Sequence, residues 1–199
     1  MAAGMVLTII ISNIGSVVSD GRELDKLRNS VLRLHILADS DSESDQQLKL
    51  MVRDALLEHS EEIFGDADSL EDAEANAQEK LGLIEEIAEE TLRENGCTDK
   101  VSAELADMHF DERVYGDITM PAGNYRALRV TIGSAQGRNW WCVMYPPLCL
   151  PAACEEEVSD DKETEEEFFD DSQRDILYNP EKYEIRFALW DKLKSLFAK

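Results

Sequence analysis

Residues 31–59 read VLRLHILADSDSESDQQLKLMVRDALLEH, and the first seven alternate in polarity. Leu32, Leu34 and Ile36 fall on one face of an extended chain, and Arg33 and His35 fall on the other. A period of two is typical of a half-buried β-strand. The pattern therefore predicts a strand over residues 31–37.

A short amphipathic helix is predicted directly after this strand. Ser44 and, three residues later, Gln47 fit a capping box at the start of a helix. Apolar or weakly polar positions then repeat at helical spacing opposite a charged face: Leu48, Val52, Ala55, Leu56 and His59. A helix with one apolar stripe packs that stripe against another element.

A second helix and three further strands are predicted toward the carboxy terminus. The helix is capped at Asp68 or Ser69 and ends at Asn95-Gly96, and its Glu-rich face is interpreted as solvent-exposed. Residues 101–110, 125–132 and 140–145 have strand character and are separated by short turns. We therefore expect an α+β fold, an antiparallel β-meander with two amphipathic helices packed on one face and a C-terminal helix.

Both ends of the chain differ from this central domain, residues 23–154. Residues 1–22 hold a 14-residue uncharged run, Met5 to Val18, which we interpret as a leader remnant, an export signal or anchor truncated at its start. A buried strand over Val6 to Val18 is the alternative. Residues 155–175 are predicted to form an acidic linker, and residues 176–199 an amphipathic C-terminal segment with a helix start at Asn179-Pro180.

Charge is abundant and unevenly distributed along the chain. The 199 residues include 43 acidic and 20 basic ones, a net charge of -23. This charge excludes sequence-independent binding to nucleic acid, and it argues against an anionic membrane surface as the partner. Residues 155–175 sum to -10, whereas residues 113–154 sum to +3. We call residues 113–154 the cationic island.

No catalytic, metal-binding or cofactor-binding residue is predicted. The four cysteines, Cys97, Cys142, Cys149 and Cys154, lack zinc-site spacing and fit either the disulfides of an exported protein or buried thiols. The acidic run at residues 39–45 lacks the glycine and the final glutamate of a calcium loop, and no hydrolase or nucleotide-binding motif is present. A proline turn between Cys142 and Cys149 favours a disulfide bond joining these two.

Two blocks of the sequence resemble a known family, stage II sporulation protein R. The first is LRLHILADSDSESDQQLKLMVRDALLEH, residues 32–59, and the second is YGDITMPAGNYRALRVTIGSAQGRNWWCVMYPPLCL, residues 115–150. The resemblance is most specific in PAGNYRALRVTIG and NWWCVMYPPLC.

This resemblance implies a signalling protein that is not an enzyme. Such a protein is made in the forespore and exported into the intermembrane space, where its N-terminal apolar segment could anchor it. There it activates a membrane-embedded aspartic protease, stage II sporulation protein GA, which processes the precursor of sigma E. No nucleic acid, cofactor or small-molecule substrate is expected.

Aromatic and Arg side chains of the cationic island are the predicted contact residues for the protease, because Trp, Tyr and Arg dominate the energetics of protein interfaces. Adjacent strand residues point to opposite faces, so one of the two Trp residues can enter the core while the other stays at the surface. Coverage of both rings by the fold is the alternative. The predicted set is Arg126, Arg129, Arg138, Trp140, Trp141 and Tyr145.

Two other classes of function remain open at this point. An extracytoplasmic cysteine hydrolase would use Cys142 as its nucleophile. A cell-wall-binding module would stack a carbohydrate on a Trp ring. An anion-binding module would bind its ligand through the Arg side chains.

Overall fold

The structure, a computed structural model, describes residues 2–67, 69–115, 117–146 and 168–197. The amino-terminal half contains α1 (Ala2–Arg28), β1 (Leu32–Leu37), α2 (Glu43–Glu58), α3 (Ser60–Phe64), α4 (Leu70–Glu79) and α5 (Leu81–Glu94). The remainder contains β2 (Val101–Phe110), β3 (Arg113–Tyr115), β4 (Ile118–Met120), β5 (Gly123–Ile132), β6 (Asn139–Tyr145), α7 (Asp171–Tyr178), the 3-10 helix η1 (Pro180–Lys182) and α8 (Glu184–Phe197).

The centre of the fold is a four-stranded sheet with the order β2-β5-β1-β6, and β3 and β4 form a separate two-stranded sheet. The predicted α+β class is confirmed. The sheet is mixed, because β1 runs parallel to β5 and antiparallel to β6, while β2 and β5 are antiparallel. The expected meander therefore holds for β2 and β5, whereas β6 crosses over to pair with β1.

Burial explains why β1 takes a central position. Leu32, Leu34 and Ile36 are fully buried, and so is the opposite face, where Arg33 is 0% and His35 is 3% exposed. The expectation of a half-buried strand is therefore wrong. A strand covered on both faces needs neighbours on both edges to pair its backbone groups, and β5 and β6 supply them.

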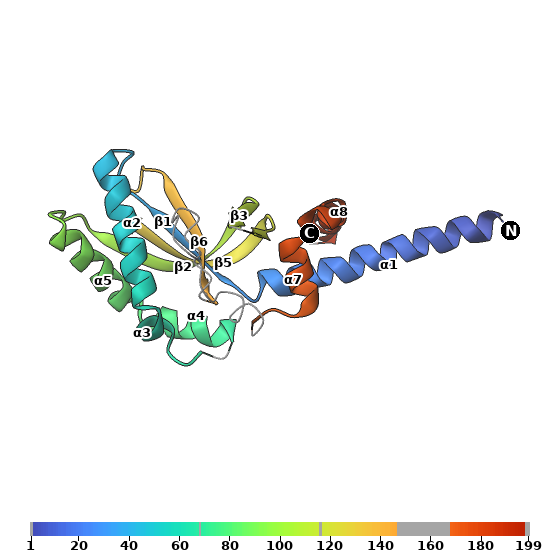
Figure 1. Cartoon of the computed structure of the whole chain (residues 1–199), viewed down its shortest axis with the longest axis horizontal. Coiled ribbons are helices and arrows are strands. Elements are labelled where there is room, and N and C mark those ends of the chain that lie inside the picture. Colours follow the sequence, from blue (N-terminus) through green and yellow to red (C-terminus); the bar gives the residue numbers. More distant parts are fainter. Residues whose placement is uncertain (1, 68, 116, 147–167, 198–199) are drawn as a thin grey trace.

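Three helices cover one face of the sheet, as Figure 1 shows for α2, α4 and α5. The predicted helix over residues 69–94 is confirmed in position, with Ser69 as its N-cap, but it divides at Lys80 into α4 and α5. The first predicted helix, α2, begins earlier than expected, because the Ser42 hydroxyl rather than that of Ser44 accepts the N-cap hydrogen bond, from the Asp45 N–H. Apolar stripes of these helices close the core.

The predicted leader is helical. Residues 2–28 form the single helix α1, so the alternative of a buried strand at Val6 to Val18 is wrong. Figure 1 shows α1 extending well beyond the sheet and its helices. Among the described residues, no helix is both long enough and apolar enough to cross a bilayer.

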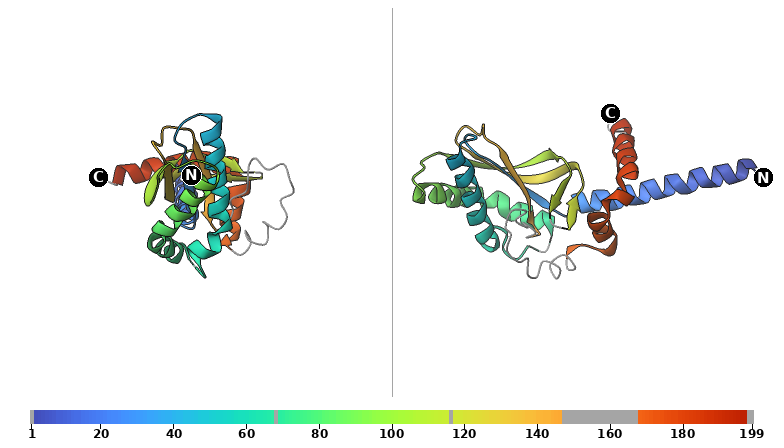
Figure 2. Two further views of the ribbon diagram at one scale, coloured as in Figure 1. Left: turned by 90° about the vertical axis from the view of Figure 1, so that its left-hand side faces the viewer. Right: turned by 45° about the horizontal axis from the view of Figure 1, so that its top comes forward.

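The carboxy-terminal helix crosses α1, as Figure 2 shows. An ion pair joins Arg28 to Asp191 with an Nη1 to Oδ1 distance of 2.8 Å, and Asp25 accepts hydrogen bonds from Trp190 and Lys194. Gly21 permits this contact, because a Cβ atom there would overlap the Trp190 ring. The opposite side of α8 is exposed and carries Ile185, Leu189, Leu193 and Leu196.

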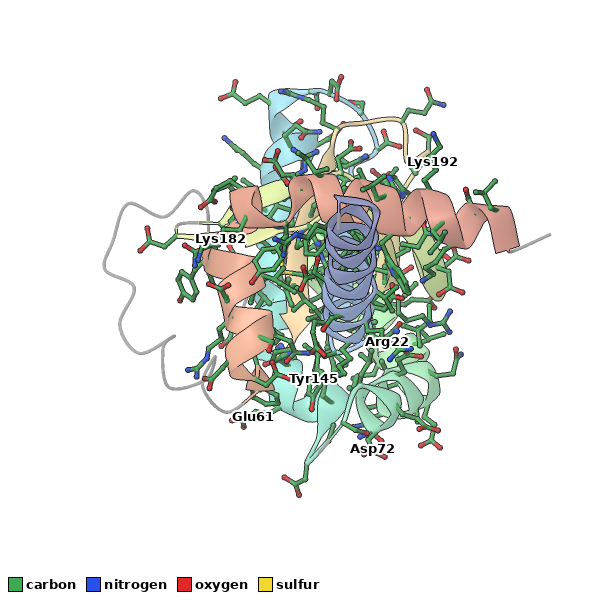
Figure 3. The ribbon with its side chains drawn as sticks, turned by 90° about the vertical axis from the view of Figure 1, so that its right-hand side faces the viewer. Arg22, Glu61, Asp72, Tyr145, Lys182 and Lys192 are labelled. Atoms are coloured by element: carbon green, nitrogen blue, oxygen red, sulfur yellow. The ribbon has the colours of Figure 1, made fainter. Side chains whose placement is uncertain are left out.

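The predicted acidic linker ends earlier than residue 175. Residues 155–167 lie outside the described residues, but Phe169 is buried and the Phe168 ring lies 5.7 Å from the ring of Tyr145. A capping box between Asp170 and Gln173 then starts α7, which lies beside α1 in Figure 3. At Asn179-Pro180 the structure has the short helix η1, and α8 follows it.

Replacing Gly21 with Leu should displace the Trp190 ring and lower the free energy of unfolding by about 1–3 kcal/mol, as overpacking does elsewhere. Urea denaturation measures this loss, and hydrogen exchange should quicken in residues 184–197. Gly15→Leu is the matched control, because Gly15 lies on the same helix and a Cβ atom added there would meet no other atom within 4 Å. Both variants gain helix propensity, so equal stabilities would contradict the proposed contact.

Candidate protein-interaction site

The strand register separates the predicted contact residues onto two faces of the sheet. His35 on β1 lies between Arg129 on β5 and Trp141 on β6, and Arg129 pairs in turn with Glu104 on β2. These four residues form one line across the sheet, which we call the cross-strand row. The row lies on the face opposite α2, α4 and α5, which we call the open face.

The other predicted strand residues lie on the helix-covered face and serve the fold. Arg126 is 3.2 Å from Glu74 of α4. The Trp140 ring lies 4.4 Å beneath the Arg53 guanidinium of α2, and the Tyr145 hydroxyl donates to the Ala67 carbonyl at 2.9 Å. The structure therefore does not bring these residues together with Arg129 and Trp141, although it confirms that the two Trp rings point to opposite faces.

Arg138 belongs to neither group. It precedes β6 in an exposed turn, where its Nε lies 3.5 Å from the Asp41 carboxylate and its side chain is 73% exposed. Its backbone carbonyl accepts a hydrogen bond from Lys49. Arg138 is thus a surface charge at the end of the sheet where α2 begins.

Trp141 is held in one orientation by aromatic contacts. Its ring stacks on His35 with centroids 4.0 Å apart and an interplanar angle of 14°. Phe110 meets the same ring edge-on at 4.7 Å. Trp141 remains partly exposed, so it presents a fixed aromatic surface to a partner. A side chain that is already ordered loses less conformational entropy on binding.

Arg129 places a positive charge beside this aromatic surface. It pairs with Glu104 at 2.9 Å, and the two side chains are 37% and 57% exposed. Exposed pairs of this kind add little stability, so the pair chiefly orients the guanidinium. The Nε atom of Arg129 is buried and has no hydrogen-bond partner among the described residues.

His35 is the buried member of the cross-strand row. Burial lowers its pKa to about 4, the positive charge of Arg129 acts in the same direction, and the Asn139 side chain offsets part of the effect. The imidazole is therefore neutral near pH 7. A neutral ring can stack on Trp141 without bringing an uncompensated charge under the surface.

Beneath the open face, Arg33 is fully buried among aromatic rings. Its Nε donates to the Cys142 carbonyl at 3.1 Å and its Nη2 donates to the Tyr115 hydroxyl at 2.7 Å. The guanidinium carbon lies 4.4 Å from the Phe110 ring centre and 5.1 Å from that of Tyr125. Burial lowers the pKa of Arg33. Arg33 is not among the predicted site residues, and its signal in the sequence is that it carries the one formal charge within residues 31–37.

The cysteines bear on the hydrolase alternative. Cys142 is fully buried and disulfide-bonded, so it offers no free thiolate, and the cysteine-hydrolase alternative loses its nucleophile. The predicted partner, Cys149, lies outside the described residues, so the pairing stays a prediction. Cys97 is a free thiol whose pKa is raised, chiefly by burial. Within the described part of the chain, no cluster of three potential metal ligands occurs.

Comparisons with known proteins agree on one family. The family model described as Stage II sporulation protein R matches residues 28–155. The chain is 33% identical to Stage II sporulation protein R of Bacillus subtilis (strain 168), over 85% of this chain and 83% of that protein. No solved structure matches the chain. The matched region contains every strand of the described residues and the whole cross-strand row.

The low pKa of His35 predicts a specific pH dependence of stability. An unfolded His titrates near pH 6.5, whereas His35 in the folded protein titrates at about 4. Between these values the unfolded chain binds the extra proton, so the free energy of unfolding falls as the pH falls, by at most about 1.4 kcal/mol per pH unit. Urea denaturation at pH 7.5, 6 and 5 should show a steeper loss in the wild type than in His35→Gln. Equal slopes would contradict the buried, neutral state of His35.

Tyr115→Phe should destabilise the protein, because it removes the hydroxyl that accepts from Arg33 and donates to the Trp141 carbonyl. Leaving a buried charged donor without its partner costs about 1–3 kcal/mol or more. Thermal and urea unfolding measure this loss. Val114→Ala, a change at a side chain that is 64% exposed on the same hairpin, should leave stability nearly unaltered.

Proposed function

Since the chain belongs to the stage II sporulation protein R family, and so has a role in sporulation, we propose that it is an exported signal that activates a protease. The protease is the membrane-embedded aspartic protease stage II sporulation protein GA, and its activation leads to cleavage of pro-sigma E. The protein acts from the intermembrane space after export from the forespore, and it acts by binding rather than by catalysis.

The observation that carries the proposal is the cross-strand row. Trp141 and Arg129 stand partly exposed on the open face, each fixed by a neighbour from another strand. An activator must bind the active state of its target more tightly than the inactive state. Each tenfold shift between the states requires about 1.4 kcal/mol of differential binding, and a buried Trp or Arg contact can supply one or more such factors.

The remaining predicted residues take different parts in this proposal. Arg138 flanks the row as an exposed charge that can steer the encounter. Arg126, Trp140 and Tyr145 act through the fold, because their contacts tie the sheet to α4, to α2 and to the segment before α4. Substitutions at these three positions are expected to affect stability before recognition.

Two features support export. The disulfide-bonded state of Cys142 fits an oxidising compartment, since disulfides persist outside the cytosol. The first nineteen residues carry no charged side chain, which fits the apolar part of an export or anchor segment.

Co-expression with the protease and pro-sigma E provides the test. Arg129→Glu should reduce precursor cleavage about tenfold or more, because it reverses the charge that the partner meets. The double variant Glu104→Arg, Arg129→Glu rebuilds the internal ion pair with its direction reversed. It should recover stability while cleavage stays low, and this separates recognition from folding.

Trp141→Ala should lower cleavage similarly, and Arg93→Glu, a change at an exposed residue of α5, serves as the surface control. Circular dichroism verifies that each variant is folded. Normal cleavage by folded Arg129→Glu and Trp141→Ala proteins would exclude the cross-strand row as the contact. No cleavage with the wild-type protein present would refute the proposed function as a whole.

A further inference from the structure

The edge strand β2 has one protected half and one open half. Its outward N–H groups at Val101 and Ala103 donate to the carboxylates of Glu89 and Glu85 of α5, at 3.4 and 2.9 Å. In an antiparallel pair, backbone groups point outward at every second residue. The N–H groups of Leu105, Asp107 and His109 therefore point outward too, and no hydrogen bond within the described part of the chain engages them.

This open half borders a broad groove. The groove has a volume of about 1220 Å³, and its floor is formed by the ends of β2 and β5, including Asp107 and Asn124. Leu70 and Glu74 of α4 line one wall, and residues of α1 and α8 line the other. Figure 1 shows α4 and α1 on different sides of this end of the sheet. An added strand would thus find free backbone groups beside space for its side chains.

The surroundings of the open half are acidic. The strand and the turn after it carry Glu104, Asp107, Asp111 and Glu112, and α4 carries Glu71, Asp72, Glu74 and Glu79 without a basic residue. Three cations lie nearby: Arg126 contacts both Glu74 and Asp107, Arg129 pairs with Glu104, and Arg113 follows Glu112 in the sequence. The eight acids outnumber these three cations, so an incoming segment with Lys or Arg side chains would meet a net negative charge.

We propose that residues 105–109 of β2 bind an extended, Lys- or Arg-bearing segment of a partner protein as a fifth strand of the sheet. Strand addition of this kind takes its affinity from main-chain hydrogen bonds and its selectivity from alternate side chains. A second copy of this chain does not fit, because two such edges would bring like charges together, and charged residues on an edge oppose self-pairing. The site lies at the sheet edge and adjoins the end of the cross-strand row at Glu104, but residues 105–109 are not part of that row, and the proposal does not depend on the proposed function.

A synthetic peptide of alternating Val and Lys, eight residues long, is the probe, and the same peptide with Glu in place of Lys is its control. Amide hydrogen exchange by NMR on the full chain reports binding residue by residue. The Lys peptide should slow exchange at Leu105, Asp107 and His109 at least fivefold and leave Val101 and Ala103 unchanged. The Glu peptide should give no protection.

Two variants separate backbone pairing from charge. Asp107→Pro removes an outward N–H that the ladder to β5 does not use, which an edge strand tolerates, and it should abolish protection. Asp107→Lys keeps the N–H and reverses the charge, and it should weaken binding of the Lys peptide at least threefold. No protection in the wild type, equal protection by both peptides, or full binding by folded Asp107→Pro would overturn the proposal. None of these results depends on precursor cleavage.

Discussion

One buried guanidinium, that of Arg33, constrains most of this structure. A charge removed from water is costly unless hydrogen bonds and polarisable neighbours replace the solvent. Here a carbonyl from β6, a hydroxyl from β3 and the ring faces of Phe110 and Tyr125 surround it. The side chain of Arg33 therefore links the central strand β1 to its neighbours β5 and β6 and to the β3–β4 hairpin. The aromatic rings that surround Arg33 lie on the open face.

The two faces of the sheet consequently differ in chemistry. Helices bury the apolar side chains of one face. On the other face, aromatic rings surround Arg33, and the cross-strand row is partly exposed to solvent. A molecule built this way presents fixed surface groups rather than an enclosed reaction chamber. This arrangement suits a protein whose proposed task is to change the state of another protein.

Local sequence patterns predicted much of the fold. They could not predict the pairing of strands that lie far apart in the sequence. Strand β2 matches its predicted bounds, and the helix at Ser69 starts as expected, because alternation and capping are properties of neighbouring residues. The β1–β5 pairing joins residues far apart in sequence, so no local pattern reveals it. Likewise, alternation alone separates Arg126 from Arg129, but only the position of the helices shows which of the two is covered.

The crossing of α8 over α1 joins residues that lie 163 to 169 positions apart in the sequence. Asp25 and Arg28 are synthesised before their partners Trp190, Asp191 and Lys194, which follow 163 to 169 residues later. Contacts so distant in sequence form late and slowly. This end of the molecule can therefore close only after α8 has been synthesised and, where the chain crosses a membrane in unfolded form, has followed α1 across it.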